Sequence, residues 1–450
     1  MALLKLEIYQ RENVKPFSPT PETSRTYKLS LLDQVAGTFY MPLVFFYGSG
    51  GSPSHDYDAL RESLSRTLSV LYPLAGRQKD EVTIECGDEG ADFLRANVTN
   101  YDLDGFLRCP KLDLIRQLFP RDPYPAAYDP AQPLLAVQVN RFLCGGTAVA
   151  ICLWHAIADG SGLVGFLETW AGFNRGAGPA VDDGARFVVD ASRVFSPVKF
   201  DFSAAISSFA ARRARKRGKY IAKRFVFSKK DIERLKDEFA TQSEHQRRPT
   251  RVEALSAFMW AAVIRAALHA NPNLKGHMLT NAVDLRRRLD PPFPTTCLGN
   301  INQVTAARWE TGSAGPATAP SLLRSVRESL AKLTNDYVRK MHESGGYFKA
   351  ISEGVNVANV GKDFMVLSMS SWFKFECLKI DFGWGRPKWL GPGNSLEDLA
   401  LLLDAQDGGI EVWIGLPRPI MCHLGKDDEF ISHVTFSQIV WEPLHMPPRL

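Results

Sequence analysis

The sequence has few cysteines and no long apolar run, and both absences narrow the classes of protein it can represent. Its 450 residues include seven cysteines and no CxxC pair, which argues against a disulfide framework or a zinc site and indicates reduced cytosolic thiols. The best apolar stretch, Thr147 to Ala158, is shorter than the roughly 18 residues a membrane span needs, and it contains His155. Lys5 and Glu7 interrupt the opening segment, so it lacks a secretory core. We therefore expect a soluble cytosolic chain that does not enter a membrane.

Excess charge of one sign is also absent. A formal net charge of +5 is small for this length and argues against a nucleic-acid partner, which would need basic residues on one face. The chain contains no GxSxG elbow, no Walker-type phosphate loop and no HExxH, so it lacks the usual signatures of α/β-hydrolases, phosphate-loop enzymes and zinc proteases. The length allows two or three domains, and we expect no metal and no permanently bound cofactor.

The first half of the chain alternates predicted strands and helices. Residues 56–76 place Leu60, Leu64, Leu68 and Leu71 on one helical stripe, and EVTIEC after them alternates like a strand. The segments LLAVQVN and TAVAICLW predict a hairpin whose second strand is buried and ends at His155. A tight Asp-Gly-Ser-Gly turn follows, and a helix begins near Leu163.

The second half repeats the same pattern after a connector at about residues 176–219. Ser228 with Asp231, and Thr250 with Glu253, predict capping boxes at two helix starts. The segment HMLTNAVDLRRR reads as a strand that runs into a basic turn. We interpret the basic cluster near the end of the connector as a solvated crossover, with a nuclear-import signal or a phosphate contact as alternatives; its members are Arg212, Arg213, Arg215, Lys216, Arg217 and Lys219.

The segment His155-Ala-Ile-Ala-Asp159-Gly160 carries the first candidate for catalysis. HxxxD alone is a weak pattern, and a second copy occurs at His423 and Asp427. The context separates the two, because His155 ends a buried strand before a glycine-rich turn, where an imidazole is held rigidly. His423 lies in a polar stretch that is predicted to be a solvated loop. On position alone, His155 is as compatible with a structural role as with catalysis.

The second candidate is DFGWG at residues 381–385. Five fixed residues that include a tryptophan are far less expected by chance than HxxxD. Its two glycines predict a rigid turn that bends around an aromatic side chain.

Together these motifs resemble the plant BAHD acyltransferase family. Further segments of the chain match that family: SLSRTLSVLYPLAGR, NAVDLRRRLDPPFP followed by LGNIN, SMSSW, and GGIEVWIGL. The opening, SRTYKLSLLD, is most similar to the branch that contains vinorine synthase and salutaridinol acetyltransferase. The resemblance implies an α/β (α+β) fold of two chloramphenicol-acetyltransferase-like domains, each a mixed sheet flanked by helices, with a channel between them. The corresponding division is residues 1–180 with HxxxD, a crossover at 181–220, and residues 221–450 with DFGWG.

The resemblance also implies the reaction, which is direct acyl transfer from acyl-CoA to a small-molecule acceptor in a ternary complex. His155 is the expected general base, since an imidazole with an ordinary pKa near ~6.5 suits proton removal from an alcohol. Asp159 is expected to form a salt bridge with Arg286 and to fix the loop that carries His155. Asp381 is retained among the essential residues, although a structural role is preferred for it.

Other expected site residues fall into two groups. Ser370 and Trp372 of SSW are candidates to stabilise the oxyanion, with core packing as the alternative for Trp372. Helix starts and basic side chains bind phosphates, so the candidate CoA contacts are Thr250, Asp284, Arg286 and Arg288, with a solvated charged turn as the alternative.

The residues alone do not identify the acyl acceptor. Branch similarity favours O-acetylation of an alkaloid or terpenoid alcohol by acetyl-CoA, with a phenolic or simple alcohol as the next option. Two other functions stay open: N-acylation of an amine, which the same base would serve, and a non-catalytic small-molecule-binding protein of the same fold. We expect a monomer.

Overall fold

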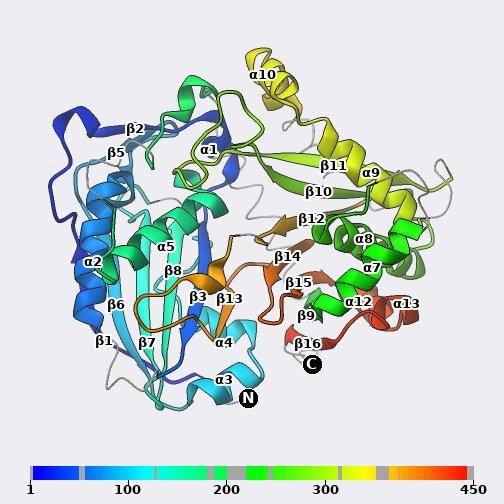
Figure 1. Ribbon diagram of the computed structural model, residues 1–450, viewed down its shortest axis with the longest axis horizontal. Helices are drawn as coiled ribbons and strands as arrows, with labels where there is room; N and C mark the ends of the chain where they lie inside the picture. Colours follow the sequence, from blue (N-terminus) through cyan, green and yellow to red (C-terminus); the bar gives the residue numbers. More distant parts are fainter. Residues whose placement is uncertain are drawn as a thin grey trace, which may run out of the picture. The chain divides into compact units, whose positions relative to one another are not determined.

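The computed structural model describes residues 4–49, 56–125, 129–179, 187–199, 219–241, 247–312, 317–350, 364–373 and 375–442. They form two compact units of mixed α/β structure, drawn in Figure 1. Unit 1 comprises Met1–Ala211, Pro291–Asn302 and Phe375–Asn394, and unit 2 comprises Arg212–Asp290, Gln303–Lys374 and Ser395–Leu450. Most of the basic cluster at 212–219 lies outside the described residues.

The predicted division into continuous stretches is wrong for two segments. Residues 291–302 and 375–394 follow the predicted crossover but pack within unit 1, so DFGWG belongs to unit 1 and not to the C-terminal domain. The reason is strand pairing over a long sequence separation. Strand β13 (Trp389–Pro392) pairs antiparallel with β3 (Tyr40–Tyr47) at the edge of the unit 1 sheet.

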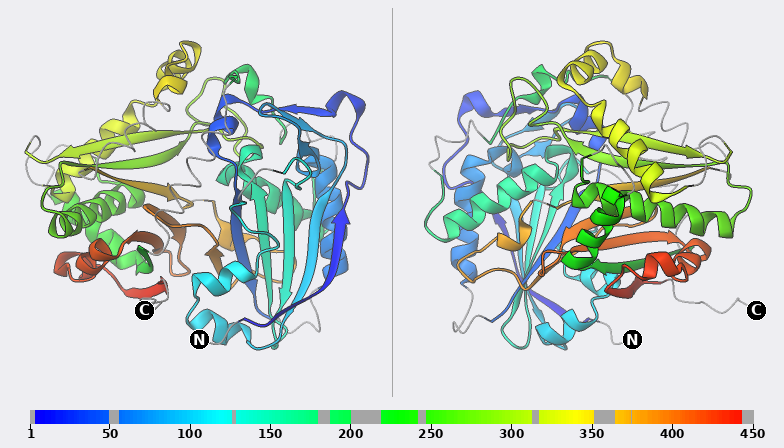
Figure 2. Two further views of the ribbon diagram at one scale, coloured as in Figure 1. Left: turned by 180° about the vertical axis from the view of Figure 1, so that it is seen from behind. Right: turned by 45° about the vertical axis from the view of Figure 1, so that its right-hand side comes forward.

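Unit 1 is built on a six-stranded sheet of order β1-β6-β7-β8-β3-β13, with a small sheet of order β2-β5-β4. The helices α2 and α5 contact each other and cover one face of the larger sheet (Figures 1 and 2). The remaining strands are β1 (Leu6–Val14), β2 (Thr26–Lys28), β4 (Arg77–Gln78), β5 (Thr83–Glu85), β6 (Ala91–Val98), β7 (Leu135–Arg141) and β8 (Thr147–Trp154). The helices are α1 (Leu31–Ala36), α2 (Tyr57–Val70), α3 (Leu103–Arg108), α4 (Leu112–Gln117) and α5 (Gly160–Asn174).

Local sequence patterns explain the elements that frame the site. Leu60, Leu64 and Leu68 are fully buried on α2, as their spacing predicted. The predicted hairpin is confirmed, since β7 and β8 pair antiparallel from Leu135 opposite Leu153 onward. Every residue of β8 is buried, which explains why its sequence is apolar without alternation.

Unit 2 contains a seven-stranded sheet of order β11-β10-β12-β14-β15-β9-β16. Strand β12 runs parallel to both β10 and β14, whereas β15, β9 and β16 continue the sheet in antiparallel pairs. Its strands are β9 (Tyr220–Phe227), β10 (Gly276–Asp284), β11 (Asn302–Glu310), β12 (Phe364–Ser371), β14 (Leu399–Asp404), β15 (Ile410–Pro417) and β16 (Phe436–Trp441). Its helices are α7 (Lys229–Thr241), α8 (Arg251–Ala270), α9 (Ala319–Ala331), α10 (Asn335–Glu343), α12 (Arg418–Leu424) and α13 (Asp428–Ile431).

Helix α8 is the core helix of unit 2. Its 20 residues reach the length and mean hydropathy of a membrane span, so the prediction that no apolar segment is long enough to span a membrane is wrong for α8. However, 78% of the apolar window is buried in the protein, where α8 contacts α7, α9 and α12. The capping box predicted at its start is confirmed, because Thr250 Oγ1 accepts from Glu253 N and Glu253 accepts from Thr250 N.

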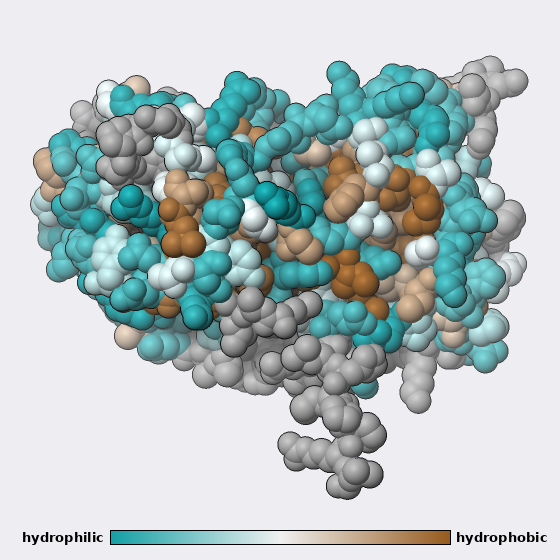
Figure 3. Space-filling model, turned by 90° about the horizontal axis from the view of Figure 1, so that it is seen from below, coloured by the Kyte–Doolittle hydropathy of each residue, from teal (hydrophilic) through white to brown (hydrophobic). Residues whose placement is uncertain are grey.

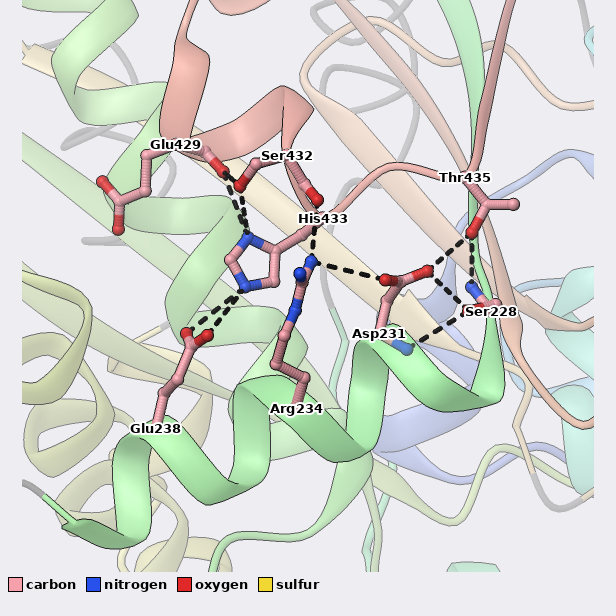
Figure 4. Close-up of polar contacts among 8 residues, drawn as sticks. All are labelled: Ser228, Asp231, Arg234, Glu238, Glu429, Ser432, His433 and Thr435. Carbon is pink, nitrogen blue, oxygen red and sulfur yellow. Dashed lines mark hydrogen bonds and ion pairs between the residues drawn. The ribbon is translucent and has the colours of Figure 1, made fainter.

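A polar cluster fastens α7 to the segment around α13 (Figure 4). Of the other predicted capping box the structure has one half, with Asp231 N donating to Ser228 Oγ. Ser228 N donates to Thr435 Oγ1 at 3.2 Å instead of to Asp231, and Thr435 Oγ1 donates to Asp231 at 2.6 Å. One turn along the helix, Arg234 donates to the Ser432 carbonyl at 2.7 Å. His433 lies 3.3 Å from Glu238 through Nε2. These contacts hold α7 against the segment around α13, although the sequence of α7 is strongly charged.

The surface is mostly hydrophilic with separate apolar patches, as one face shows in Figure 3. At the outer strand of the unit 2 sheet, Phe436 and Ile439 are exposed, as is Ile431 just before it. Arg224 covers part of this patch, with its guanidinium carbon 5.6 Å from the centre of the Phe436 ring.

Candidate active site

His155 stands directly after the last residue of β8, at the start of a short 3-10 turn. Its backbone N–H donates to the Phe39 carbonyl at 2.9 Å, and the Phe39 ring contacts the imidazole edge-on at a centroid distance of 5.0 Å. Phe39 also stacks on Tyr124 at 5.4 Å. Both aromatic rings are partly exposed, so the histidine lies beside an accessible aromatic surface in unit 1.

The loop from His155 to Asp159 is joined to residues 299–302 by a short run of backbone pairing. Ala158 and Gly299 form a parallel bridge, in which Gly299 N donates to Ile157 O at 2.9 Å. Asn300 Nδ2 donates to the His155 carbonyl at 2.7 Å. The LGNIN segment therefore holds the catalytic loop over its whole length.

Asp159 serves this loop and the helix after it. One carboxylate oxygen accepts from Gly162 N at 3.1 Å and so caps α5. The other accepts from Ile301 N at 3.1 Å and from Asn302 Nδ2 at 3.3 Å. The structure thus places Asp159 as a residue that fixes the loop. The predicted salt bridge with Arg286 would join the two units and stays a prediction.

Two residues of this network, Asp33 and Asn300, were not predicted from the sequence. Asp33 is fully buried, and its Oδ1 accepts from Asn300 N at 2.6 Å and from Asn300 Nδ2 at 3.0 Å. Both residues lie inside segments that supported the family resemblance, SRTYKLSLLD and LGNIN. Their contact joins positions 267 residues apart, which no local pattern reveals.

Burial lowers the pKa of His155 below its usual range. Backbone hydrogen bonding, the charge of Asp159, the Asn300 side chain and the charge of Asp33 oppose this effect. The ring is therefore neutral at neutral pH, as a general base must be. Nδ1 is buried although the residue as a whole is partly exposed, so Nε2 is the nitrogen available to a substrate.

Gly160 is required next to this loop for a steric reason. A Cβ at that position would come within 2.5 Å of the Phe375 ring, which packs against the start of α5. The glycine of HxxxDG thereby admits Phe375, a residue of the segment that returns to unit 1.

Asp381 lies away from His155. Its Oδ1 accepts from Gly383 N at 2.7 Å and from Gly385 N at 2.9 Å, and both glycines have positive φ, of 90° and 86°. Its carbonyl accepts from Arg175, which ends α5. Because His155 precedes the other end of this 15-residue helix, the two motifs are separated by about 22 Å along α5. Its inclusion among catalytic residues is therefore not supported, and the preferred structural role fits these contacts.

The aromatic residues of DFGWG pack as the sequence suggested. Phe382 is buried and contacts Trp170 of α5 at 4.8 Å, edge-on. Trp384 contacts Tyr47 of β3 at 5.6 Å. The loop thus ties the C-terminal end of α5 to the sheet.

The two candidate oxyanion donors are joined to one another in unit 2. The Trp372 indole Nε1–H donates to Ser370 Oγ at 3.1 Å. Ser370 lies on β12, and Trp372 follows that strand, where its backbone N–H donates to the Leu402 carbonyl at 2.8 Å. The Ser370 hydroxyl, with its oxygen already accepting, keeps its own proton to donate.

The predicted CoA contacts occupy differing environments in unit 2. Thr250 is engaged in the α8 capping box, as described above. Arg288 donates to the carbonyls of Leu330 and Leu333, both at 3.1 Å. Arg286 is fully buried, with a 3.4 Å contact to the half-exposed Asp284, so Thr250 and Arg288 are better placed than Arg286 to face a soluble ligand.

The fold and the comparisons with known proteins define the chain as an acyltransferase. The chain matches the model described as the Transferase family over residues 4–431, and it belongs to this family, the BAHD acyltransferases. It is 33% identical to limonoid 1-O-acetyltransferase of Citrus sinensis, over 94% of this chain and 97% of that protein. It is 29% identical to stemmadenine O-acetyltransferase of Catharanthus roseus, with 96% and 99% covered.

Solved structures agree with the fold. The crystal structure of vinorine synthase superposes with a TM-score of 0.77 at 27% identity, covering 96% of this chain and 98% of that one. The TRI101 protein of F. sporotrichioides superposes with a TM-score of 0.74 at 18% identity, covering 91% and 99%. The predicted chloramphenicol-acetyltransferase-like fold is confirmed.

Proposed function

We propose that this acyltransferase moves an acetyl group from acetyl-CoA to a hydroxyl of an alkaloid or terpenoid, with His155 as general base. The observation that carries the proposal is the setting of His155, a neutral, partly exposed imidazole fixed at the end of a buried strand. The relatives named as O-acetyltransferases of limonoids and of stemmadenine support the oxygen acceptor and the acetyl donor.

Nε2 of His155 accepts the proton of the acceptor hydroxyl as its oxygen attacks the thioester carbonyl carbon. The carbon–sulfur bond of the tetrahedral intermediate then breaks, CoA leaves as thiolate, and the imidazolium returns the proton to sulfur. No acyl-enzyme forms. Holding both substrates beside one base removes the entropy cost of a bimolecular encounter, which supplies a large part of the acceleration.

The negative oxygen of the intermediate needs a hydrogen-bond donor. The Ser370 hydroxyl is the proposed donor, and the Trp372 indole N–H, which donates to the Ser370 oxygen, makes that hydroxyl a stronger donor. For the phosphates of CoA we retain the start of α8 at Thr250 together with Arg288. We further propose that the protein works as a monomer in the cytosol.

Release of free CoA thiol from acetyl-CoA tests the proposal. The purified chain would be offered a panel of alkaloid, terpenoid, phenolic and simple alcohols with matched amines, and acyl products would be identified by mass spectrometry. The proposal expects acceptor-dependent release and an ester product. Faster turnover of the amines would favour N-acylation, and no release with any donor or acceptor would indicate a binding protein.

A further inference from the structure

A fully buried carboxylate behind the catalytic loop is not used by the mechanism above. Asp33 has four hydrogen-bond donors on its two oxygens. Its Oδ2 accepts from Ser30 N at 2.8 Å and from Ser30 Oγ at 2.7 Å, which is the capping box of α1. Its Oδ1 accepts from the backbone and side-chain nitrogens of Asn300.

These contacts determine which way the Asn300 amide points. Nδ2 has two hydrogens, and it donates to Asp33 Oδ1 at 3.0 Å and to the His155 carbonyl at 2.7 Å. A carboxylate only accepts hydrogen bonds, so the flipped amide would set two oxygens against each other at Asp33. Oδ1 of Asn300 is therefore held on the opposite side from Asp33.

The carbonyl that accepts from Asn300 lies beside the imidazole of the same residue. Nδ1 of His155 is buried, and hydrogen bonding with the residue's own backbone is the largest of the influences that raise the pKa of the ring. The Asn300 side chain also contributes hydrogen bonding that raises the pKa of His155. A carbonyl beside Nδ1 favours the tautomer that has its proton on Nδ1 and its lone pair on Nε2, and Asn300 Nδ2 holds that carbonyl at 2.7 Å.

We propose that Asp33, acting through Asn300, is a positioning residue for His155 that holds the ring in the tautomer with Nε2 as base. This inference rests on the proposed function. Asp33 touches neither substrate, and its effect is confined to the geometry and charge state of the imidazole.

Asp33→Asn is the primary test, because it keeps the size of the side chain and allows the Asn300 amide to flip. We expect kcat for an alcohol acceptor to fall about 10- to 100-fold, as for misplacement of a catalytic group, with the KM for acetyl-CoA unchanged. The charge of Asp33 raises the pKa of His155, so the acid limb of kcat/KM should move to lower pH. A purely structural role for Asp33 would not move that limb.

Ser30→Ala is the matched control, because it removes a hydrogen bond from the other oxygen of the same carboxylate. It should lower the melting temperature and leave kcat unchanged. If Ser30→Ala lowers kcat as much as Asp33→Asn does, Asp33 acts only through folding, and the proposal is overturned.

A double-mutant cycle tests the route through Asn300. Asn300→Ala should lower kcat, and adding Asp33→Asn to it should cost little more, because the relay is already broken. Additive losses would overturn the proposal. If Asp33→Asn does not fold, an unchanged kcat in Asn300→Ala overturns the proposal in its place. If the wild-type protein releases no CoA with any acceptor, the proposed function itself is refuted. If the wild type is active and the variants have the same kcat, only the role of Asp33 is refuted.

Discussion

The two HxxxD segments of this chain have the same spacing but different surroundings. In both, the aspartate caps the helix that follows, since Asp159 accepts from Gly162 N and Asp427 accepts from Phe430 N. The histidines differ, because His155 directly follows a buried strand and has a buried Nδ1. His423 is exposed, as predicted, but it lies on helix α12 and not in a loop, and it stacks on His269 at 5.5 Å. The HxxxD spacing therefore predicts an aspartate that caps the following helix. Whether the histidine is held in place as a catalytic base depends on the buried strand before it.

The aspartates differ in what they fix beyond the cap. Asp159 holds the backbone of residues 301–302 and so secures the loop of the catalytic base. Asp427 accepts from Arg265 of α8 through both oxygens, at 2.8 and 3.0 Å. One cap supports the site, and the other supports the core of unit 2.

The largest effect should come from the histidines. His155→Ala is expected to lower kcat by about 10²- to 10⁴-fold, the contribution of a general base, while acetyl-CoA binding measured by calorimetry stays near the wild-type value. His423→Ala, the matched control, should have wild-type kcat. A comparable loss at His423 would mean that the wrong HxxxD has been assigned to catalysis.

The aspartates should separate activity from stability. Asp159→Asn keeps a capping oxygen but replaces an acceptor of the 301–302 contacts with a donor, so kcat should fall about 10- to 100-fold through misplacement of His155. Asp427→Asn should leave kcat unchanged and lower the free energy of unfolding by about 1 kcal/mol through the loss of the ion pair. Steady-state kinetics measures kcat, and urea denaturation measures the free energy of unfolding. Wild-type kcat in Asp159→Asn would show that the position of His155 does not depend on the contacts of Asp159 with residues 301–302.

A third histidine shows what burial does without catalysis. His277 is fully buried, its Nδ1 accepts from Trp260 Nε1 at 2.9 Å, and burial lowers its pKa to about 3. In the unfolded chain this histidine is protonated below about pH 6.5, whereas in the folded chain it is protonated only below about pH 3. Between these two pH values the free energy of unfolding should therefore fall, as the pH falls, by up to about 1.4 kcal/mol per pH unit. Urea denaturation at several pH values should show that the free energy of unfolding depends less steeply on pH in His277→Gln than in the wild type. Equal dependence in the two proteins would show that His277 does not cause the loss of stability at low pH.

Much of the fold follows from local sequence patterns. The leucine stripe of α2, the β7–β8 hairpin, the capping box at Thr250 and the cap at Ser228 were each predictable, because spacing and cap chemistry act within a few residues. The same holds for His155, which the buried strand before it singled out. The turn around Phe382 was also predictable from its two glycines.

Long-range pairing was not predictable in this way. The return of residues 375–394 to unit 1 depends on β13 pairing with β3, and the position of Asp381 follows from that return. The contact of Asp33 with Asn300 was likewise not predictable, because the two residues are 267 positions apart and the sequence around each of them does not indicate the other. The cap that Asp159 forms on α5 and its contacts with residues 301–302 were not predicted either.

The pH dependence of kcat/KM for one alcohol acceptor, measured in wild type and in His155→Gln, tests the role of His155 most directly. Burial lowers the pKa of His155, and only the neutral ring accepts a proton. Wild-type activity should therefore hold as the pH falls past about 6.5 and be lost at lower pH through one ionisation, and the residual activity of His155→Gln should lack that step. An acid limb that persists unchanged in His155→Gln would contradict the assignment of this histidine as the base.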